Sequence, residues 1–141
     1  MSKTTGRLQQ AAAIAIRRRD DTLEVCLIRS RKSRKWGIPK GLIDPGDTEE
    51  ETALNEAWEE AGLKGRLLGN AIGTYEYRKW GTTLEVAVYV MEVLEEHDDW
   101  QEADFRERRW TPFGVATSLL SDHPVRPLLD LARTLLSGSK A

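Results

Sequence analysis

The order of apolar and polar positions divides this 141-residue chain into strands and helices. Short apolar runs separated by turn residues predict strands, because a strand needs only a few residues to bury its side chains. We expect strands at 10–17, 23–28, 65–69, 71–80, 82–93 and 106–110. Brief turns join the first two strands and also the fourth and fifth, so each of these pairs predicts a hairpin.

The C-terminal half contains one central strand and two helices. Valines at 86, 88 and 90 alternate with Ala87, Tyr89 and Met91, so both faces of that strand are apolar, as in the middle of a sheet. Helices are predicted at 112–120 and 124–136. The second helix has a broad apolar stripe, which consists of Leu128, Leu129, Leu131, Ala132, Leu135 and Leu136.

The strongest helix signal follows a turn-rich stretch in the middle of the chain. Thr48 is a favourable N-cap residue, Glu51 completes a capping box, and Gly62 is typical of the position just after a helix. The spacing i, i+3, i+4, i+7 predicts the buried face. That face would consist of Leu54, Ala57, Trp58 and Ala61.

Three carboxylates crowd one face of this helix. Glu56, Glu59 and Glu60 have the spacing i, i+3, i+4, which predicts that they lie together on the side opposite the apolar stripe. Like charges at this spacing repel one another, and 47–62 contains no basic residue. A divalent cation would remove the repulsion, since Mg²⁺ and Mn²⁺ prefer oxygen ligands. The alternative is a solvated acidic face.

Composition limits the class of protein. A chain of this length is expected to form a single domain, 1–141, with flexible ends at 1–8 and 137–141. Apolar residues make up 40% and charged residues 31%, and the net charge of −2 favours neither a nucleic-acid nor a membrane partner. Cys26 lies in an apolar run and is expected to be an inert buried thiol. We expect a cytoplasmic location, because no stretch has the pattern of a signal peptide or a membrane span.

The segment 41–63 resembles the Nudix box, a motif of fixed spacing in the Nudix hydrolase superfamily. Seven residues match the motif: Gly41, Glu56, Ala57, Glu59, Glu60, Gly62 and Leu63. Two positions depart from it, since Asp47 stands where the family has Glu and Asn55 where it has Arg. The resemblance implies the Nudix α/β/α sandwich, in which a mixed β-sheet lies between the box helix and the C-terminal helices.

The resemblance also implies a pyrophosphohydrolase that depends on Mg²⁺ or Mn²⁺. By the match, the metal would be held by the carbonyl of Gly41 and the carboxylates of Glu56, Glu59 and Glu60. Glu59 and Glu60 are also the candidates from the box for the catalytic base that activates water. A later loop adds three further candidates: Glu102, Asp104 and Glu107.

A basic loop at 30–35 precedes the box. We expect Arg31, Lys32, Arg34 and Lys40 to bind substrate phosphates, since cations meet the excess negative charge of a polyphosphate. A solvated loop is the alternative. Three aromatic residues are candidates for stacking on a base or for packing in the core, namely Tyr75, Tyr77 and Trp80.

Three later features resemble the diphosphoinositol polyphosphate phosphohydrolase branch, whose members also cut dinucleoside polyphosphates. They are Trp100 in an acidic loop, the arginine-rich stretch 106–110, and the sequence His123-Pro124-Val125. We therefore expect a small-molecule polyphosphate substrate and a monomer or homodimer. The alternatives are a Nudix pyrophosphohydrolase for a nucleoside triphosphate, a capped RNA end or ADP-ribose, and a degenerate domain that binds a nucleotide without cutting it.

Overall fold

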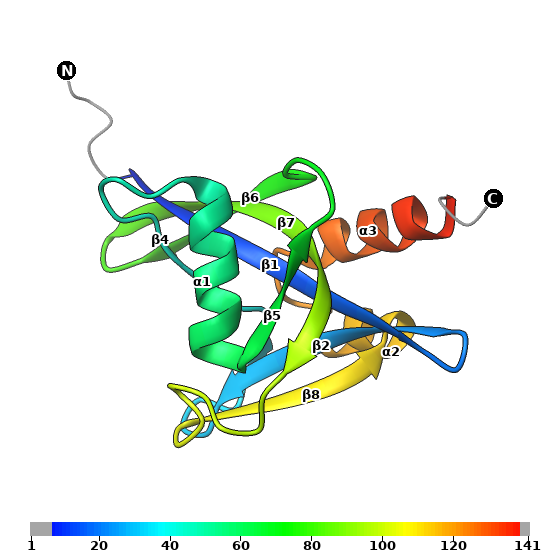
Figure 1. Cartoon of the computed structure of the whole chain (residues 1–141). Helices are drawn as coiled ribbons and strands as arrows, with labels where there is room; N and C mark the ends of the chain where they lie inside the picture. The colour runs from blue at the N-terminus through cyan, green and yellow to red at the C-terminus, as the bar shows by residue number, and fades with distance from the viewer. Residues whose placement is uncertain (1–6, 139–141) are drawn as a thin grey trace.

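An eight-stranded mixed sheet separates one helix from two others in the computed structural model, which describes residues 7–138 (Figure 1). The predicted α/β/α sandwich is confirmed. In chain order the elements are β1 (Arg7–Arg19), β2 (Thr22–Ser30), β3 (Trp36–Gly37), β4 (Lys40–Leu42), α1 (Glu49–Ala61), β5 (Leu63–Leu67), β6 (Gly73–Lys79), β7 (Thr82–Glu96), β8 (Arg106–Pro112), α2 (Phe113–Leu119) and α3 (Arg126–Gly138).

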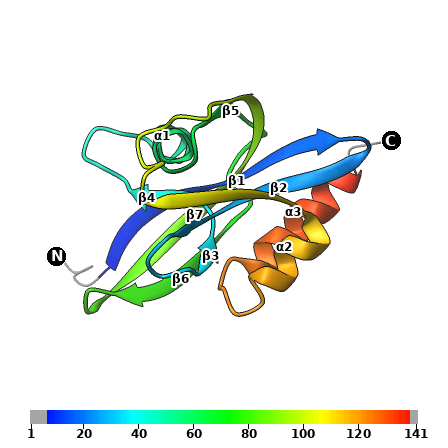
Figure 2. The ribbon, with the colours of Figure 1, turned by 90° about the horizontal axis from the view of Figure 1, so that it is seen from below.

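Strands β1 and β7 form the centre of the sheet and run parallel to each other. Strand β1 also pairs antiparallel with β2 and β4, while β7 pairs antiparallel with β5 and β6. Strand β2 adds β3 and β8. Both predicted hairpins are present, and the prediction of a central strand at 82–93 is confirmed, although β7 extends to Glu96. In Figure 2, α1 lies on one side of the sheet, and α2 and α3 lie on the other.

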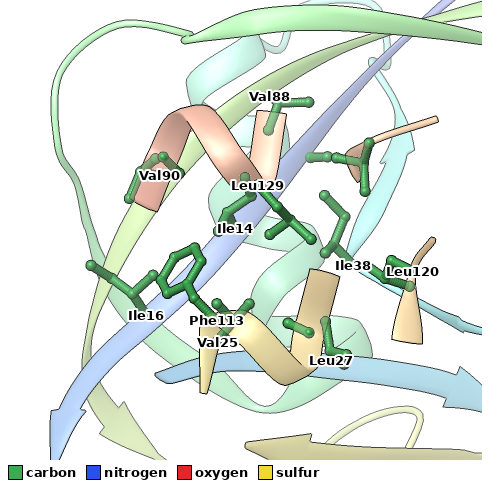
Figure 3. Packing of buried hydrophobic residues seen from close by; sticks show 14 of the residues in the cluster. Ile14, Ile16, Val25, Leu27, Ile38, Val88, Val90, Phe113, Leu120 and Leu129 are labelled. Atoms are coloured by element: carbon green, nitrogen blue, oxygen red, sulfur yellow. The ribbon is translucent and has the colours of Figure 1, made fainter. Parts of the chain in front are cut away.

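The sheet has two apolar faces, because side chains alternate along β1. Three of its residues, Ala12, Ile14 and Ile16, face the layer that contains α2 and α3, where they pack with residues such as Phe113 and Leu129 (Figure 3). The intervening residues of β1 face α1 and are all alanine: Ala11, Ala13 and Ala15. A small side chain on this face allows α1 to approach the sheet closely.

Helix α1 begins and ends as its sequence predicts. The Thr48 side chain accepts a hydrogen bond from the Glu51 N–H, the Glu51 carboxylate accepts one from the Thr48 N–H, and Gly62 ends the helix at φ 68°. Ala57 and Ala61 lie on the buried face as predicted, and Ala53 joins them. The predicted Leu54 and Trp58 are only half-buried, and Glu60, expected on the opposite side, is buried. These shifts arise because the alanines of α1 and β1 meet directly.

The C-terminal end of α1 accepts hydrogen bonds from residues 97–108, which comprise the loop after β7 and the start of β8 and are called the β7–β8 segment below. Four carbonyls of the last turn and cap accept hydrogen bonds: Glu59 from the Glu102 N–H at 3.2 Å, Glu60 from the Trp100 indole at 3.0 Å, Ala61 from the Arg108 guanidinium at 2.6 Å, and Gly62 from the His97 N–H at 2.9 Å. Such carbonyls have no partner within a helix, and a cation beside them also interacts favourably with the helix dipole. This segment therefore fixes the position of the acidic helix.

The lead-in to α1 contains two short strands, β3 and β4, that the sequence pattern does not predict. They are too short to show an apolar alternation, and pairing with β2 and β1 defines them.

Of the predicted flexible ends, residues 1–6 and 139–141 lie outside the described residues, whereas 7–8 begin β1 and 137–138 end α3. Cys26 is fully buried as expected, and burial raises the pKa of its thiol to about 12.

Gly62 should be much less tolerant of alanine than Gly81, although both have φ 68°. A Cβ at Gly81 would meet open space, so Gly81→Ala should cost roughly 1–2 kcal/mol of left-handed strain. A Cβ at Gly62 would lie 2.9 Å from the Trp100 Cβ, so overpacking should add about 1–3 kcal/mol. Urea unfolding of both variants measures the difference, and equal losses would contradict the packing of Trp100 against the helix end.

Candidate active site

Two carboxylates of α1 meet the backbone of β4, Glu56 at Gly41 and Glu60 at Lys40. A Cβ on Gly41 would lie 2.3 Å from the Glu56 Cδ, so only glycine leaves room for that carboxylate. Glu60, one turn along the same helix, accepts a hydrogen bond from the Lys40 N–H at 3.2 Å. The turn-rich segment between β4 and α1 thus reverses the chain, so that α1 packs against the strand that precedes it.

The charges of these carboxylates oppose one another. Burial first, and then the charge of the neighbouring Glu60 and a hydrogen bond with it, raise the pKa of Glu56 to about 8. Burial also raises the pKa of Glu60, although Arg106 and the Lys40 N–H partly offset this effect. Glu59 and Glu102 add negative charge near Glu56. The cluster therefore retains a proton at neutral pH and favours a cation.

One cation already lies beside the cluster. The Arg106 Nη2 is 3.4 Å from a Glu60 oxygen, and its Nε donates to Glu102. Arg106 begins β8, directly after the loop that binds the end of α1. The β7–β8 segment consequently supplies both the hydrogen bonds that position the helix and an arginine that neutralises part of its charge.

A pocket of about 500 Å³ opens beside Glu60. Its walls come from β2, β3, β4, β6, the start of β8 and the loop between α2 and α3. Five cationic side chains line it: Arg29, Lys35, Lys40, Lys79 and Arg106. Aromatic residues form much of the remaining wall, namely Trp36, Tyr75 and Tyr77. A polyphosphate attached to a flat ring system suits a pocket with both kinds of wall.

The residues predicted to bind substrate are distributed over three places. Lys40 lines the pocket, with its Nζ 5.2 Å from the Tyr77 ring, and burial lowers its pKa. Arg34 lines a second, adjoining pocket of about 400 Å³. Arg31 is 3.4 Å from Glu107 in an ion pair, and Lys32 is exposed and lines neither pocket.

Several residues of the pocket were not proposed from the sequence. They are Arg29, Lys79, Arg106 and His123, whereas Lys35 belongs to the basic loop that the sequence predicts to bind phosphates. Pairing of β2 with β8 brings Arg29 opposite Glu107, and these side chains form an ion pair at 2.7 Å. The alternation of charged residues in 106–110 gave a partial signal for Arg106. Lys79 and His123 come from distant hairpin and loop segments, which local patterns do not place at one site.

The candidates for the base differ in their surroundings. Glu107 is held by Arg29, which lowers the pKa of its carboxyl. Asp104 is exposed. Glu102 lies beside Arg106 and acts electrostatically on both Glu56 and Glu60. Of the loop candidates, Glu102 is therefore the one that belongs to the carboxylate cluster.

Comparison with known proteins places this arrangement in a family. The family model described as NUDIX domain matches residues 7–130. The chain belongs to the Nudix family. The Nudix box of this chain thus comprises the Gly41 turn and helix α1, and the carboxylates that meet β4 are those of the box.

Relatives and solved structures agree with this family. The chain is 36% identical to "Nudix hydrolase 12, mitochondrial" of Arabidopsis thaliana over 69% of its length, and spans 52% of that protein. It is 29% identical to the human diphosphoinositol polyphosphate phosphohydrolase 3-alpha over 93% of its length and 80% of that protein. It thus spans about half the length of its Arabidopsis relatives.

A solved structure shows the same fold over nearly the whole chain. It is the crystal structure of a binary complex of the Caenorhabditis elegans Ap4A hydrolase, with a TM-score of 0.82 at 21% sequence identity. The match covers 93% of this chain and 98% of that one. Within residues 7–138, every helix is too short or too polar to span a lipid bilayer.

The Nudix box fits a divalent cation by its donor chemistry, because Glu56 and Glu60 are hard oxygen donors that lack sufficient counter-charge. Within residues 7–138, no three acidic, histidine or cysteine side chains are already arranged as a complete metal site. The predicted metal role of Gly41, Glu56, Glu59 and Glu60 stays a prediction. The Glu56 carboxylate lies against Gly41, so two of the residues in this prediction are neighbours in space.

The stability of the metal-free protein should fall as the pH rises from about 4.5 to about 8. Glu56 has an unfolded-state pKa near 4.5 and a folded-state pKa of about 8, so the folded state binds more protons in this window. Below pH 4.5 the Glu56 carboxyl is protonated in both the folded and the unfolded state. Above pH 8 it is charged in both states, and the free energy of unfolding is lowered by the full cost of burying the charge. Urea midpoints in chelator at pH 5, 6.5 and 8 measure this trend.

The Glu56→Gln variant should flatten this pH dependence, since it removes the titrating group and keeps its shape. Glu50→Gln, in the exposed first turn of α1, removes one carboxylate outside the cluster and should preserve the slope. A pH profile that is unchanged by Glu56→Gln would contradict the raised pKa.

Proposed function

We propose that this chain is a divalent-metal-dependent Nudix hydrolase that cleaves a phosphoanhydride bond of a dinucleoside polyphosphate or a diphosphoinositol polyphosphate. The observation that carries the proposal is the contact of Glu56 with Gly41 and of Glu60 with the Lys40 N–H, beside a pocket lined by cations. The carboxylates suit a metal that bridges phosphates, and the cations suit the phosphates that the metal does not neutralise.

The box residues would hold the cation: the Gly41 carbonyl, Glu56, Glu59 and Glu60. Held there, a divalent cation would supply charge neutralisation on a phosphoanhydride and a lowered pKa for an attacking water. Lys40 and Arg106 would bind phosphate oxygens, since both line the pocket beside Glu60. A carboxylate that does not hold the cation would accept the proton from water. Glu102 is a candidate alongside Glu59 and Glu60 because Arg106 orients it.

The names of similar proteins support the substrate class. The human relative is named a diphosphoinositol polyphosphate phosphohydrolase, and the similar C. elegans structure is an Ap4A hydrolase. Both kinds of substrate carry more phosphate charge than an ordinary nucleotide. The five cationic side chains of the pocket fit such a substrate.

Hydrolysis by the wild-type protein should require Mg²⁺ or Mn²⁺. Glu56→Gln and Glu60→Gln should each lower kcat by about 10²-fold or more, because each removes a metal ligand or the base. Phosphate or mononucleotide release from diadenosine tetraphosphate and a diphosphoinositol polyphosphate, with and without Mg²⁺, measures this effect. Circular dichroism should show that both variants are folded. Turnover within a few-fold of wild type in both would refute the metal-site assignment.

Lys35→Ala should weaken the use of highly charged substrates more than Lys32→Ala does. The two lysines lie in one loop, but Lys35 lines both pockets and Lys32 lines neither. At low salt, Lys35→Ala should raise KM for a tetraphosphate by roughly 2- to 5-fold, and by less for a nucleoside diphosphate sugar. The difference should shrink as salt rises, because exposed charges are screened. Equal effects of the two variants would show that the loop acts only through its total charge.

A further inference from the structure

The hydroxyl of Tyr75 lacks a partner in the unliganded pocket. Tyr75 is 7% exposed and lines the pocket. Within residues 7–138, its Oη is one of two buried side-chain polar atoms without a hydrogen bond, the other being the Thr111 Oγ1. Leaving such a group unpaired costs about 1–3 kcal/mol. A phenylalanine at this position would avoid this cost. We therefore look for a hydrogen-bond partner of the Tyr75 hydroxyl outside the chain, in a bound ligand.

His123 presents a second uncharged donor beside Tyr75. Its Nδ1 accepts a hydrogen bond from the Val125 N–H at 3.0 Å, so the neutral ring carries its proton on Nε2. Burial, with a smaller effect from Lys40, lowers the pKa of His123 to about 4, so the ring is neutral at physiological pH. The His123 and Tyr75 rings meet edge to face, with centroids 5.5 Å apart.

The surroundings of these two donors are apolar and flat. Trp36, Ile38 and Pro124 line the same pocket. The cations of the pocket are partly occupied elsewhere, since Arg29 pairs with Glu107 and lies 4.4 Å from the Trp36 ring centroid. Uncharged donors among aromatic rings suit a neutral acceptor on a planar ring, whereas the lysines and arginines of the pocket suit phosphates.

We propose that Tyr75 and His123 are specificity-determining residues, which donate hydrogen bonds to acceptor atoms of a nucleobase. This inference rests on the proposed function and narrows it, because it favours a dinucleoside polyphosphate over a diphosphoinositol polyphosphate. An inositol carries phosphates around its ring and offers no flat ring with neutral acceptors. The nucleobase occupies the part of the pocket between β3, β6 and the loop that connects α2 to α3.

Binding of non-hydrolysed probes tests the inference without any turnover. Calorimetry with adenosine, guanosine, cytidine and uridine 5′-monophosphates, each compared with ribose 5-phosphate, isolates the contribution of the base. Wild type should bind at least one nucleotide more tightly than ribose 5-phosphate. Tyr75→Phe and His123→Asn should each lower the affinity for that nucleotide by about 3- to 10-fold. The affinity for ribose 5-phosphate should stay unchanged in both variants. The asparagine retains an oxygen that accepts the Val125 N–H.

Stability distinguishes recognition from a structural role. Tyr75→Phe removes an unpaired hydroxyl and should leave the urea midpoint unchanged or raise it. Tyr89→Phe is the matched control, because the Tyr89 hydroxyl donates to Glu49 at 2.8 Å and does not line the pocket. This control should lower the midpoint and leave nucleotide affinity unchanged.

Two results would overturn the inference. One is equal affinity of wild type for every nucleotide and for ribose 5-phosphate, and the other is unchanged nucleotide affinity in both Tyr75→Phe and His123→Asn. Base-dependent binding in a protein that cuts no polyphosphate would support the recognition site and refute the proposed hydrolase activity. Hydrolysis of a diphosphoinositol polyphosphate without base-dependent binding would support the hydrolase and refute the recognition site.

Discussion

The close approach of α1 to the sheet is the constraint on which the rest of this structure depends. Alanines on β1 meet alanines on α1, so little side-chain volume separates the two elements. Gly41 continues this contact at the edge strand β4, where the Glu56 carboxylate occupies the space that a Cβ would fill. A larger residue in place of these alanines would move the helix outward, and a side chain at Gly41 would displace the Glu56 carboxylate from β4.

Holding the helix there places like charges together, and the β7–β8 segment offsets part of that cost. Trp100 and Arg108 donate to the last carbonyls of α1, and Arg106, in the same segment, forms an ion pair with Glu60. One stretch of chain thus fixes the helix end and supplies a cation to its acidic face. Burial and the remaining negative charge raise the pKa of Glu56, and both effects would favour a bound divalent cation.

One pocket contains both cationic side chains and uncharged hydrogen-bond donors. Two of its cationic side chains, Lys40 and Arg106, lie near Glu60, whereas Tyr75 and His123 add uncharged donors among aromatic rings. Charge favours polyphosphates as a class, and directional donors in a buried setting discriminate among the groups attached to them. A single fold can therefore serve substrates with the same reacting bond and different ends.

The sequence by itself determined the elements that local chemistry specifies. The capping box at Thr48, the left-handed Gly62, the alternation along 82–93 and the box spacing each depend on residues that are near one another in the chain. Tertiary structure shifted the buried face of α1 toward Ala53 and Glu60, because the alanines of α1 pack against those of β1 and leave the predicted Leu54 and Trp58 half-buried. It also decided the composition of the pocket. Arg29, Lys79 and His123 come together only through strand pairing and loop packing, and no local pattern encodes the distance between segments so far apart in the chain.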